Sequence, residues 1–322
     1  MNEQKAQSND AASLDEAARA AWLYYVGGKT QDQIARELGI SRQRAQRLVS
    51  KAMAEGLVQV RLEHRVSHCL ELETALRRTY GLKKCRVAPG PGQGSDPLRS
   101  LAPIAASEME RVLMADDPLV IALGTGRTLR ATVEELPAMD CPQHRIVSLN
   151  GNIAPDGSAS FFDVIMRIAD KVKAPHYPMP LPVIASTPEE RDLFLSLAPV
   201  KRARQLAETA DVVFVGVGEL SAEPPLLKDG FANRDELYEL QRAGAVGEIA
   251  GWAYDAAGRY LTVGTNRRTA GVRIDPSEQR LTFAIAAGER KLPALRAALQ
   301  GRIVNSLITD EATATALLPD AT

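Results

Sequence analysis

The sequence has few of the residues from which covalent or metal-based sites are built. Its 322 residues include only three cysteines and four histidines. Cys69, Cys85 and Cys141 are odd in number and show no CxxC spacing, which argues against a disulfide framework and a zinc finger and fits a reducing cytosol. His64 and His68 lie near Cys69 in the sequence, but no second pair of ligands accompanies them. We therefore expect neither a metal nor a cofactor.

Long apolar runs and an excess of one charge are also lacking. No apolar run is longer than a buried strand, so we expect no membrane-spanning helix, and the polar residues 1–12 do not form a signal peptide but a disordered tail. The net charge is −1, so a surface that binds nucleic acid has to be local. With 45% hydrophobic and 25% charged residues, the composition is that of a globular protein, and the length suggests two domains. We expect a cytoplasmic protein.

Residues 30–58 are typical of two short helices joined by a tight turn. Thr30 and Gln33 have the spacing of a capping box at the start of the first helix. Gly39 can adopt the positive φ that a sharp turn between helices requires, and Ser41 can cap the second helix. Small and apolar residues recur at helical spacing on both sides of the turn: Ile34, Ala35, Leu38, Ala45, Leu48, Val49 and Met53. This pattern predicts a helix-turn-helix.

The second helix of this motif carries positive charge and, from residue 42 to residue 51, no acid. Arginine and glutamine can pair with the edges of guanine and adenine in the major groove of DNA. An ordinary helical hairpin with a solvated basic face is the alternative. We favour DNA binding, with these candidate contacts: Thr30, Gln31, Ser41, Arg42, Gln43, Arg44, Gln46, Arg47 and Lys51.

The predicted DNA-binding domain covers residues 13–65 and begins with a supporting helix at residues 14–26. That helix has these side chains available for packing: Leu14, Ala18, Ala21, Trp22 and Tyr25. Residues 57–62 alternate between apolar and polar side chains, which is the period of a strand. The strand is either a wing that brings Arg61 and Arg65 near DNA phosphates or a plain hairpin strand, and the sequence does not distinguish the two.

A larger domain is predicted at residues 83–322, joined by a connecting helix at residues 66–82 that could also pair with its copy in a dimer. Short apolar strands alternate there with helices, which predicts an α/β fold with a mostly parallel sheet covered by helices on both faces. The predicted strands cover residues 84–89, 118–123, 145–149, 181–185, 211–217, 281–285 and 304–308. In such sheets ligands bind beyond the carboxyl ends of the strands.

Several of these strands end in glycine-rich or polar residues. Gly124 to Thr128 form a turn that opens a helix, where backbone N–H groups can cradle an anion. The turn is neither GxGxxG nor a Walker loop, and glycine is also common in strand-to-helix turns that bind nothing. Glu248, expected on a loop, suits sugar hydroxyls, although a solvated surface acid is the commoner case. Together with nearby cations, these strand ends suggest a small polyhydroxylated anion. The candidate ligand contacts are Gly124, Thr125, Gly126, Arg127, Thr128, Asn150, Gly151, Asn152, Gly218, Glu248, Arg268 and Lys291.

In their order and spacing, these motifs resemble the SorC family of bacterial sugar-responsive transcriptional regulators over about residues 17–318. The resemblance rests on Leu48 and on GISR (39–42), GLV (56–58), GTGRT (124–128), DVVFVGV (211–217), GAVGE (244–248), NRR (266–268), GERK (288–291) and LITDEAT (307–313). It implies a winged DNA-reading domain and an effector domain similar in fold to glucosamine-phosphate deaminases and ribose-phosphate isomerases. It also implies a tetramer on operator DNA that is switched by a sugar phosphate or a related polyol.

Carried over to this chain, the resemblance places the effector's phosphate on the turn at residues 124–128, with Lys291 opposite. It places Glu248 toward hydroxyls, and Arg268 where it lines or braces the pocket. Three positions differ from the common family pattern: Glu248 replaces a frequent Asp, Asn150-Gly151-Asn152 replaces a glycine pair, and Ala287-Gly288 replaces Gly-Gly. The effector thus stays open between a free and a phosphorylated polyol of four to six carbons.

The alternative from another class is a sugar-phosphate isomerase or deaminase with an acquired DNA-binding domain. That chemistry needs a positioned general base and usually a histidine or second carboxylate beside it. Glu219 and Glu248 could act as the base, but neither His144 nor His176 adjoins a strand end with an acid. We therefore expect a non-enzymatic regulator with three kinds of partner: operator DNA, a sugar phosphate, sugar or polyol effector, and further copies of the chain.

Overall fold

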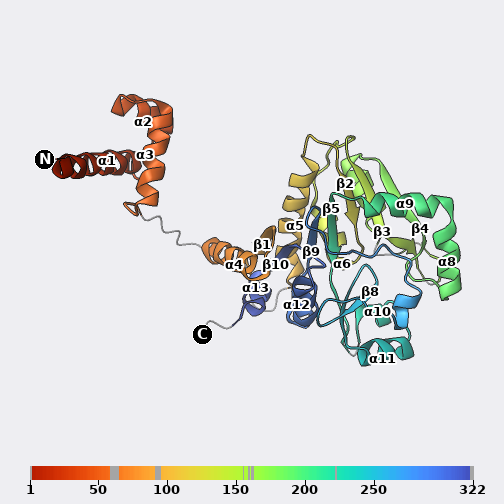
Figure 1. Cartoon of the computed structure of the whole chain (residues 1–322). Coiled ribbons are helices and arrows are strands. Elements are labelled where there is room, and N and C mark those ends of the chain that lie inside the picture. The colour runs from red at the N-terminus through yellow and green to blue at the C-terminus, as the bar shows by residue number, and fades with distance from the viewer. Residues whose placement is uncertain are drawn as a thin grey trace. The chain divides into compact units, whose positions relative to one another are not determined.

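The computed structural model describes residues 2–58, 65–90, 96–154, 156–158, 160, 163–221 and 223–319. By its internal contacts the chain divides into two compact units, Met1–His64 and Arg65–Thr322, which are described separately (Figure 1). Among the helices of the described residues, none is both long enough and apolar enough to cross a membrane.

The first unit consists of α1 (Asn2–Tyr25), α2 (Gln31–Leu38) and α3 (Arg42–Ala54). Their shared core is small and rich in alanine, with Ile34 fully buried and Leu48 and Val49 nearly so. The structure differs from the expected tail at residues 1–12, since α1 begins at Asn2. This stretch contains Ala, Gln, Glu and Lys, which favour helices, so a polar composition alone does not prevent one.

The packing face of two helices is shifted from the one that the sequence predicts. On α3, Ala52 is fully buried, whereas Met53 is 42% exposed. On α1, the predicted Ala21 is fully buried, together with Ala17 and Ala20, whereas Ala18 is exposed and Trp22 and Tyr25 are 59% and 41% exposed. The physical reason is that helices in so small a core approach closely through alanines, which leaves the larger side chains at the rim.

The second unit is built on a parallel sheet of seven strands in the order β1-β10-β9-β5-β2-β3-β4, which confirms the predicted α/β class. Its strands are β1 (Lys84–Ala88), β2 (Val120–Leu123), β3 (Arg145–Ile153), β4 (His176–Pro182), β5 (Val212–Gly216), β9 (Leu281–Ile285) and β10 (Ser306–Asp310). The helices are α4 (Arg65–Tyr80), α5 (Leu98–Leu113), α6 (Arg127–Glu135), α7 (Ile165–Val172), α8 (Pro188–Ser196), α9 (Ala198–Glu208), α10 (Pro225–Lys228), α11 (Arg234–Arg242), α12 (Leu292–Gln300) and α13 (Glu311–Leu317), with short 3-10 turns η1 (Gly264–Arg267) and η2 (Glu289–Lys291).

Both faces of this sheet are buried, because alternate residues of each strand point to opposite sides. Ile121 and Phe214 belong to one hydrophobic cluster, which also contains residues of α5, α6 and α7. Ala122 and Val213 belong to the other, with residues of α4, α9, α12 and α13. The rings of Phe214 and Phe283 stack with centroids 4.9 Å apart. Continuous apolar runs are therefore needed in the central strands, and this explains why the sequence revealed them.

Two departures from the predicted strands matter for the site. Strand β3 continues to Ile153, so Asn150, Gly151 and Asn152 lie on a strand and not in a loop after it. A second, antiparallel sheet joins β6 (Gly218–Glu219), β7 (Ala245–Ile249) and β8 (Trp252–Asp255). Glu248 therefore stands on β7, paired with Gly218, and not on a loop. These short, glycine-containing strands lack the alternation that marks a strand in the sequence.

Candidate functional site

The helix-turn-helix has the caps that its sequence predicts. Thr30 accepts a hydrogen bond from the backbone N–H of Gln33 at 3.3 Å and donates its own N–H to the Gln33 side chain at 2.8 Å. Gly39 ends α2 in the left-handed conformation, with φ of 64°. Ser41 then caps α3 by accepting the N–H of Arg44 at 3.3 Å. These caps fix the direction in which α3 leaves the turn.

The predicted DNA contacts lie on the outer surface of this motif. All are exposed except Gln31 and Lys51, which are half-buried. Arg44 pairs with Glu16 of α1 at 2.9 Å, and Lys51 donates to Ser13 at 2.9 Å. Arg47 has no hydrogen bond or ion pair to any residue that the structure describes. Exposed pairs such as the one at Arg44 contribute little stability, so a DNA phosphate can replace the acid at small cost.

The predicted wing falls largely on residues 59–64, which include Arg61. These residues lie outside those that the structure describes. Arg65 is the first residue of α4 and not part of a strand. Among the residues described, no group of three or more His, Cys, Asp and Glu side chains could hold a metal ion.

In the second unit, a cavity of 420 Å³ lies where the carboxyl ends of β2, β5 and β9 approach each other. This is the position at which open parallel sheets bind ligands. Apolar side chains from Val183, Ile184, Leu226 and Phe231 form part of its wall. Nine of the twelve predicted ligand contacts line it: Gly124, Thr125, Gly126, Arg127, Thr128, Asn150, Gly218, Glu248 and Lys291.

The glycine-rich turn after β2 forms one side of the cavity. Gly126 has φ of 119°, a conformation that only glycine adopts readily, and α6 begins at the next residue. A Cβ at Gly124 would lie 3.2 Å from Val215, so the turn is packed closely on β5. The first N–H groups of α6 have no partner within the helix. Arg127 reaches across to Asp229, with Nη2 at 2.8 and 3.2 Å from the two carboxylate oxygens.

Glu248 and Lys291 bring opposite charges to the cavity. The Glu248 carboxylate accepts the N–H of Gly251 at 2.8 Å. A Cβ at Gly218 would overlap that carboxylate, so the glycine provides the space in which it lies. Burial raises the pKa of Glu248, although the N–H of Gly251 and the charge of Lys291 act in the opposite direction. Burial lowers the pKa of Lys291, although Glu248 and then Glu219 oppose this. Each charge is thus partly balanced by the other.

Only the first residue of the predicted Asn-Gly-Asn group reaches the cavity. Asn150 is 4% exposed, and its Oδ1 has no hydrogen-bond partner among the described residues. Gly151 does not line the cavity, since it packs against the backbone of Leu181 and Pro182, where a Cβ would overlap both carbonyl oxygens. Asn152 also lies outside the lining.

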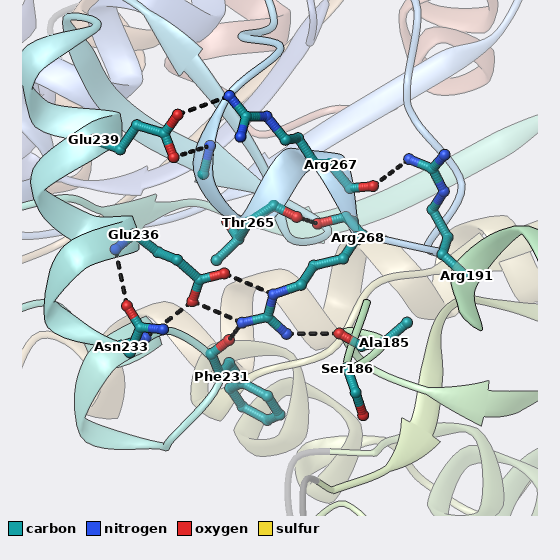
Figure 2. A network of polar contacts seen from close by, with 12 residues as sticks. Ala185, Ser186, Arg191, Phe231, Asn233, Glu236, Glu239, Thr265, Arg267 and Arg268 are labelled. Atoms are coloured by element: carbon teal, nitrogen blue, oxygen red, sulfur yellow. Dashed lines mark hydrogen bonds and ion pairs between the residues drawn. The ribbon is translucent and has the colours of Figure 1, made fainter. Parts of the chain in front are cut away.

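Arg268 is likewise not part of the lining, and the structure assigns it the bracing position of the two that the resemblance allowed (Figure 2). Its guanidinium donates to both carboxylate oxygens of Glu236, at 2.6 and 2.7 Å. It also donates to the carbonyl oxygens of Ala185 at 2.6 Å and Phe231 at 3.2 Å. Arg268 therefore ties α11 to the end of β4 and holds Phe231, which lines the cavity.

The lining residues that sequence reasoning missed include Asp229 and Phe231. They follow α10, which is not preceded by an apolar strand, so no strand-end signal marks them. No histidine that the structure describes lines the cavity. His144 is fully buried, with Nδ1 accepting the N–H of Leu119 at 3.2 Å and Nε2 lying 3.0 Å from the carbonyl oxygen of Leu113.

Comparisons with known proteins cover both units. Residues 64–319 match the Sugar-bind family of sugar-binding domains, and residues 20–65 match a MarR family model. The chain is 36% identical over 302 residues to the erythritol catabolism regulatory protein EryD of Brucella abortus, covering 94% of this chain and 96% of EryD. It is 30% identical over 311 residues to the transcriptional regulator LsrR of Escherichia coli K12, covering 94% of each. Its fold is similar to the full-length sorbitol operon regulator SorC from Klebsiella pneumoniae, with a TM-score of 0.70, 26% identity, and coverage of 95% of this chain and 99% of that one.

Proposed function

The chain belongs to the SorC family of sugar-binding transcriptional regulators, and from this premise we propose that a small ligand in the 420 Å³ cavity controls operator binding by α3. The cavity is the observation that carries the proposal. It lies within the residues that match the sugar-binding family, and its volume falls in the range of small-molecule sites.

The polar groups of the cavity suit a polyhydroxylated ligand. The backbone N–H groups at the start of α6 donate hydrogen bonds, the Asn150 carbonyl accepts them, and Glu248 and Lys291 offer charged partners. The names of two relatives refer to erythritol and sorbitol, which are both polyols. We therefore assign the effector to the class of sugars, polyols and their phosphates.

On the DNA side, α3 enters the major groove and presents Gln43, Gln46 and Arg47 to base edges. Arg42, Arg44 and the other exposed cations of the motif contact phosphates. The chain acts in the cytoplasm as a homo-oligomer, because a helix-turn-helix protein gains affinity and specificity by reading two half-sites at once.

The relatives are named as regulators, and we propose that this chain also does not turn its ligand over. Glu248 is a carboxylate in the cavity with a raised pKa, as a general base has. A proton-transfer reaction needs a second group to complete it. The described histidines lie outside the cavity, and of its other carboxylates Asp229 is held by Arg127 at 2.8 and 3.2 Å. Glu219, the other carboxylate that the sequence offers as a base, accepts the N–H of Ser221 and pairs with Arg290 at 3.5 Å.

A thermal-shift screen of the full chain against sugars, polyols and their phosphates tests the proposal. A ligand at about 100 times its dissociation constant adds about 2.7 kcal/mol of stability, a clearly measurable shift. We expect a stabilising compound to change the affinity for DNA that the protein itself selects from a random pool. The proposal fails if no compound in these classes stabilises the protein, if the stabilising compound leaves DNA affinity unchanged, or if that compound is consumed.

A further inference from the structure

The charged side chains that line the cavity do not favour an anion. The cations are Arg127 and Lys291, and the carboxylates are Asp96, Asp229 and Glu248, so the lining carries two positive and three negative groups. The N-terminus of α6 adds about half a positive charge. A phosphate dianion would therefore enter a site whose charge is already close to balanced.

Each of the two cations has a carboxylate of its own. Arg127 holds Asp229 through both carboxylate oxygens, at 2.8 and 3.2 Å, so a phosphate at the start of α6 would compete with that carboxylate. The Asp229 side chain is only 19% exposed, so its negative charge would remain near a ligand bound at the start of α6. Lys291 lies in the field of Glu248, whose charge acts on it more strongly than any other.

The uncharged part of the lining includes donors, such as the backbone N–H groups at the start of α6, and one buried acceptor that lacks a donor among the described residues. Asn150 is only 4% exposed, and its Oδ1 has no hydrogen-bond partner in the described part of the chain. Buried acceptors of this kind cost stability until a donor reaches them. A hydroxyl group supplies that donor, whereas the oxygens of a phosphate dianion only accept. Glu248 and Asp229 are further acceptors in the same cavity.

Resting on the proposed function, we infer that the effector is an uncharged polyol, whose hydroxyls donate to Asn150, Glu248 and Asp229, and that its phosphorylated form is rejected. The apolar wall at Ile184 and Phe231 packs against the carbon chain of the polyol. Selectivity arises because a phosphate at the start of α6 would displace Asp229 from Arg127 and would add negative charge beside the three carboxylates of the lining.

Calorimetric titration of the full chain with erythritol, ribitol and sorbitol, and with the terminal monophosphate of each, tests the inference. We expect one polyol to bind at least about tenfold more tightly than its own monophosphate, the effect of one well-placed charge or hydrogen bond. A monophosphate that binds more tightly and still shifts DNA affinity would overturn the inference while the proposed function stands. If no compound of either series binds, both fail.

Two variants test the residues. Asn150→Leu removes the unpartnered acceptor at similar size, so we expect unchanged or higher stability but a loss of polyol affinity of about tenfold or more. Asp229→Asn releases Arg127. The ratio of polyol affinity to monophosphate affinity should therefore change about tenfold in favour of the monophosphate. Asp140→Asn makes the same charge change at an exposed position outside the cavity and serves as the control. Equal shifts at Asp229 and Asp140, or an Asn150→Leu protein that binds the polyol normally, would refute the inference.

Discussion

Replacing Arg268 with methionine should destabilise the second unit far more than the same change at the neighbouring Arg267. Each arginine pairs with one glutamate of α11 (Figure 2). In the pair of Arg268 and Glu236, the side chains are 18% and 17% exposed. In the pair of Arg267 and Glu239, they are 55% and 38% exposed. The two positions thus compare the same chemistry at different burial.

The size of the difference follows from the partners that are left behind. Without Arg268, the Glu236 carboxylate keeps only the backbone N–H of Asn233, and the carbonyls of Ala185 and Phe231 lose a donor. Removing one partner of a buried ion pair costs about 3–5 kcal/mol. Because water still reaches part of this pair, we expect the lower limit, about 3 kcal/mol. The exposed pair at Arg267 should contribute about 0.5 kcal/mol.

Urea unfolding measures both values. The chain has two tryptophans, Trp22 and Trp252, so fluorescence in a Trp22→Phe background reports the unit that contains Trp252. A double-mutant cycle with Glu236→Gln should give a coupling energy of about 2 kcal/mol for the Arg268 pair. If Arg268→Met and Arg267→Met change the free energy of unfolding to within 1 kcal/mol of each other, the bracing role of Arg268 is refuted.

Three further predictions concern other parts of the chain. Arg47→Ala should weaken DNA binding about tenfold, reduce the slope of log affinity against log salt by about one, and leave polyol binding unchanged; fluorescence anisotropy over a salt series measures this, and an unchanged slope contradicts contact by α3. Gly218→Ala should displace the carboxylate of Glu248 and abolish polyol binding in calorimetry, while DNA binding without ligand persists. Burial raises the pKa of Glu108, but hydrogen bonds from Lys84 and Arg86 outweigh this and lower the pKa below 4.5. The ionised carboxylate therefore stabilises the fold fully above pH 4.5, and this stabilisation is lost as the pH falls through the lowered pKa. Glu108→Gln should therefore cost about 2 kcal/mol in urea unfolding at neutral pH and less under acid conditions, and a pH-independent cost would contradict this.

The parallel sheet could be predicted because its central strands are buried on both faces and thus read as continuous apolar runs. Strand β9 matches its predicted range at both ends. Strand β4 was placed several residues too late. Its Pro178, Pro180 and Pro182 read as loop, yet an edge strand tolerates prolines because one side of it donates to no neighbour.

Several cavity residues could be predicted because they come at or after the end of an apolar run in a strand of the parallel sheet. Gly124 and Asn150 could be found in this way, since the carboxyl ends of parallel strands share one edge. The pairing of Glu248 with Gly218 depends on the small antiparallel sheet, whose strands are too short to leave a periodic pattern. Asp229 approaches Arg127 only through the fold, across 102 positions of sequence, so no local signal predicts that pair.

The most direct test of ligand-controlled DNA binding is a pair of reciprocal affinity measurements on the full chain. DNA affinity is measured by anisotropy with and without saturating polyol, and polyol affinity by calorimetry with and without the same DNA. Because the two sites are coupled through one free energy, both ratios should agree, and a tenfold change corresponds to about 1.4 kcal/mol. Equal factors well above one are the predicted result, and a polyol that binds without changing DNA affinity would contradict the account.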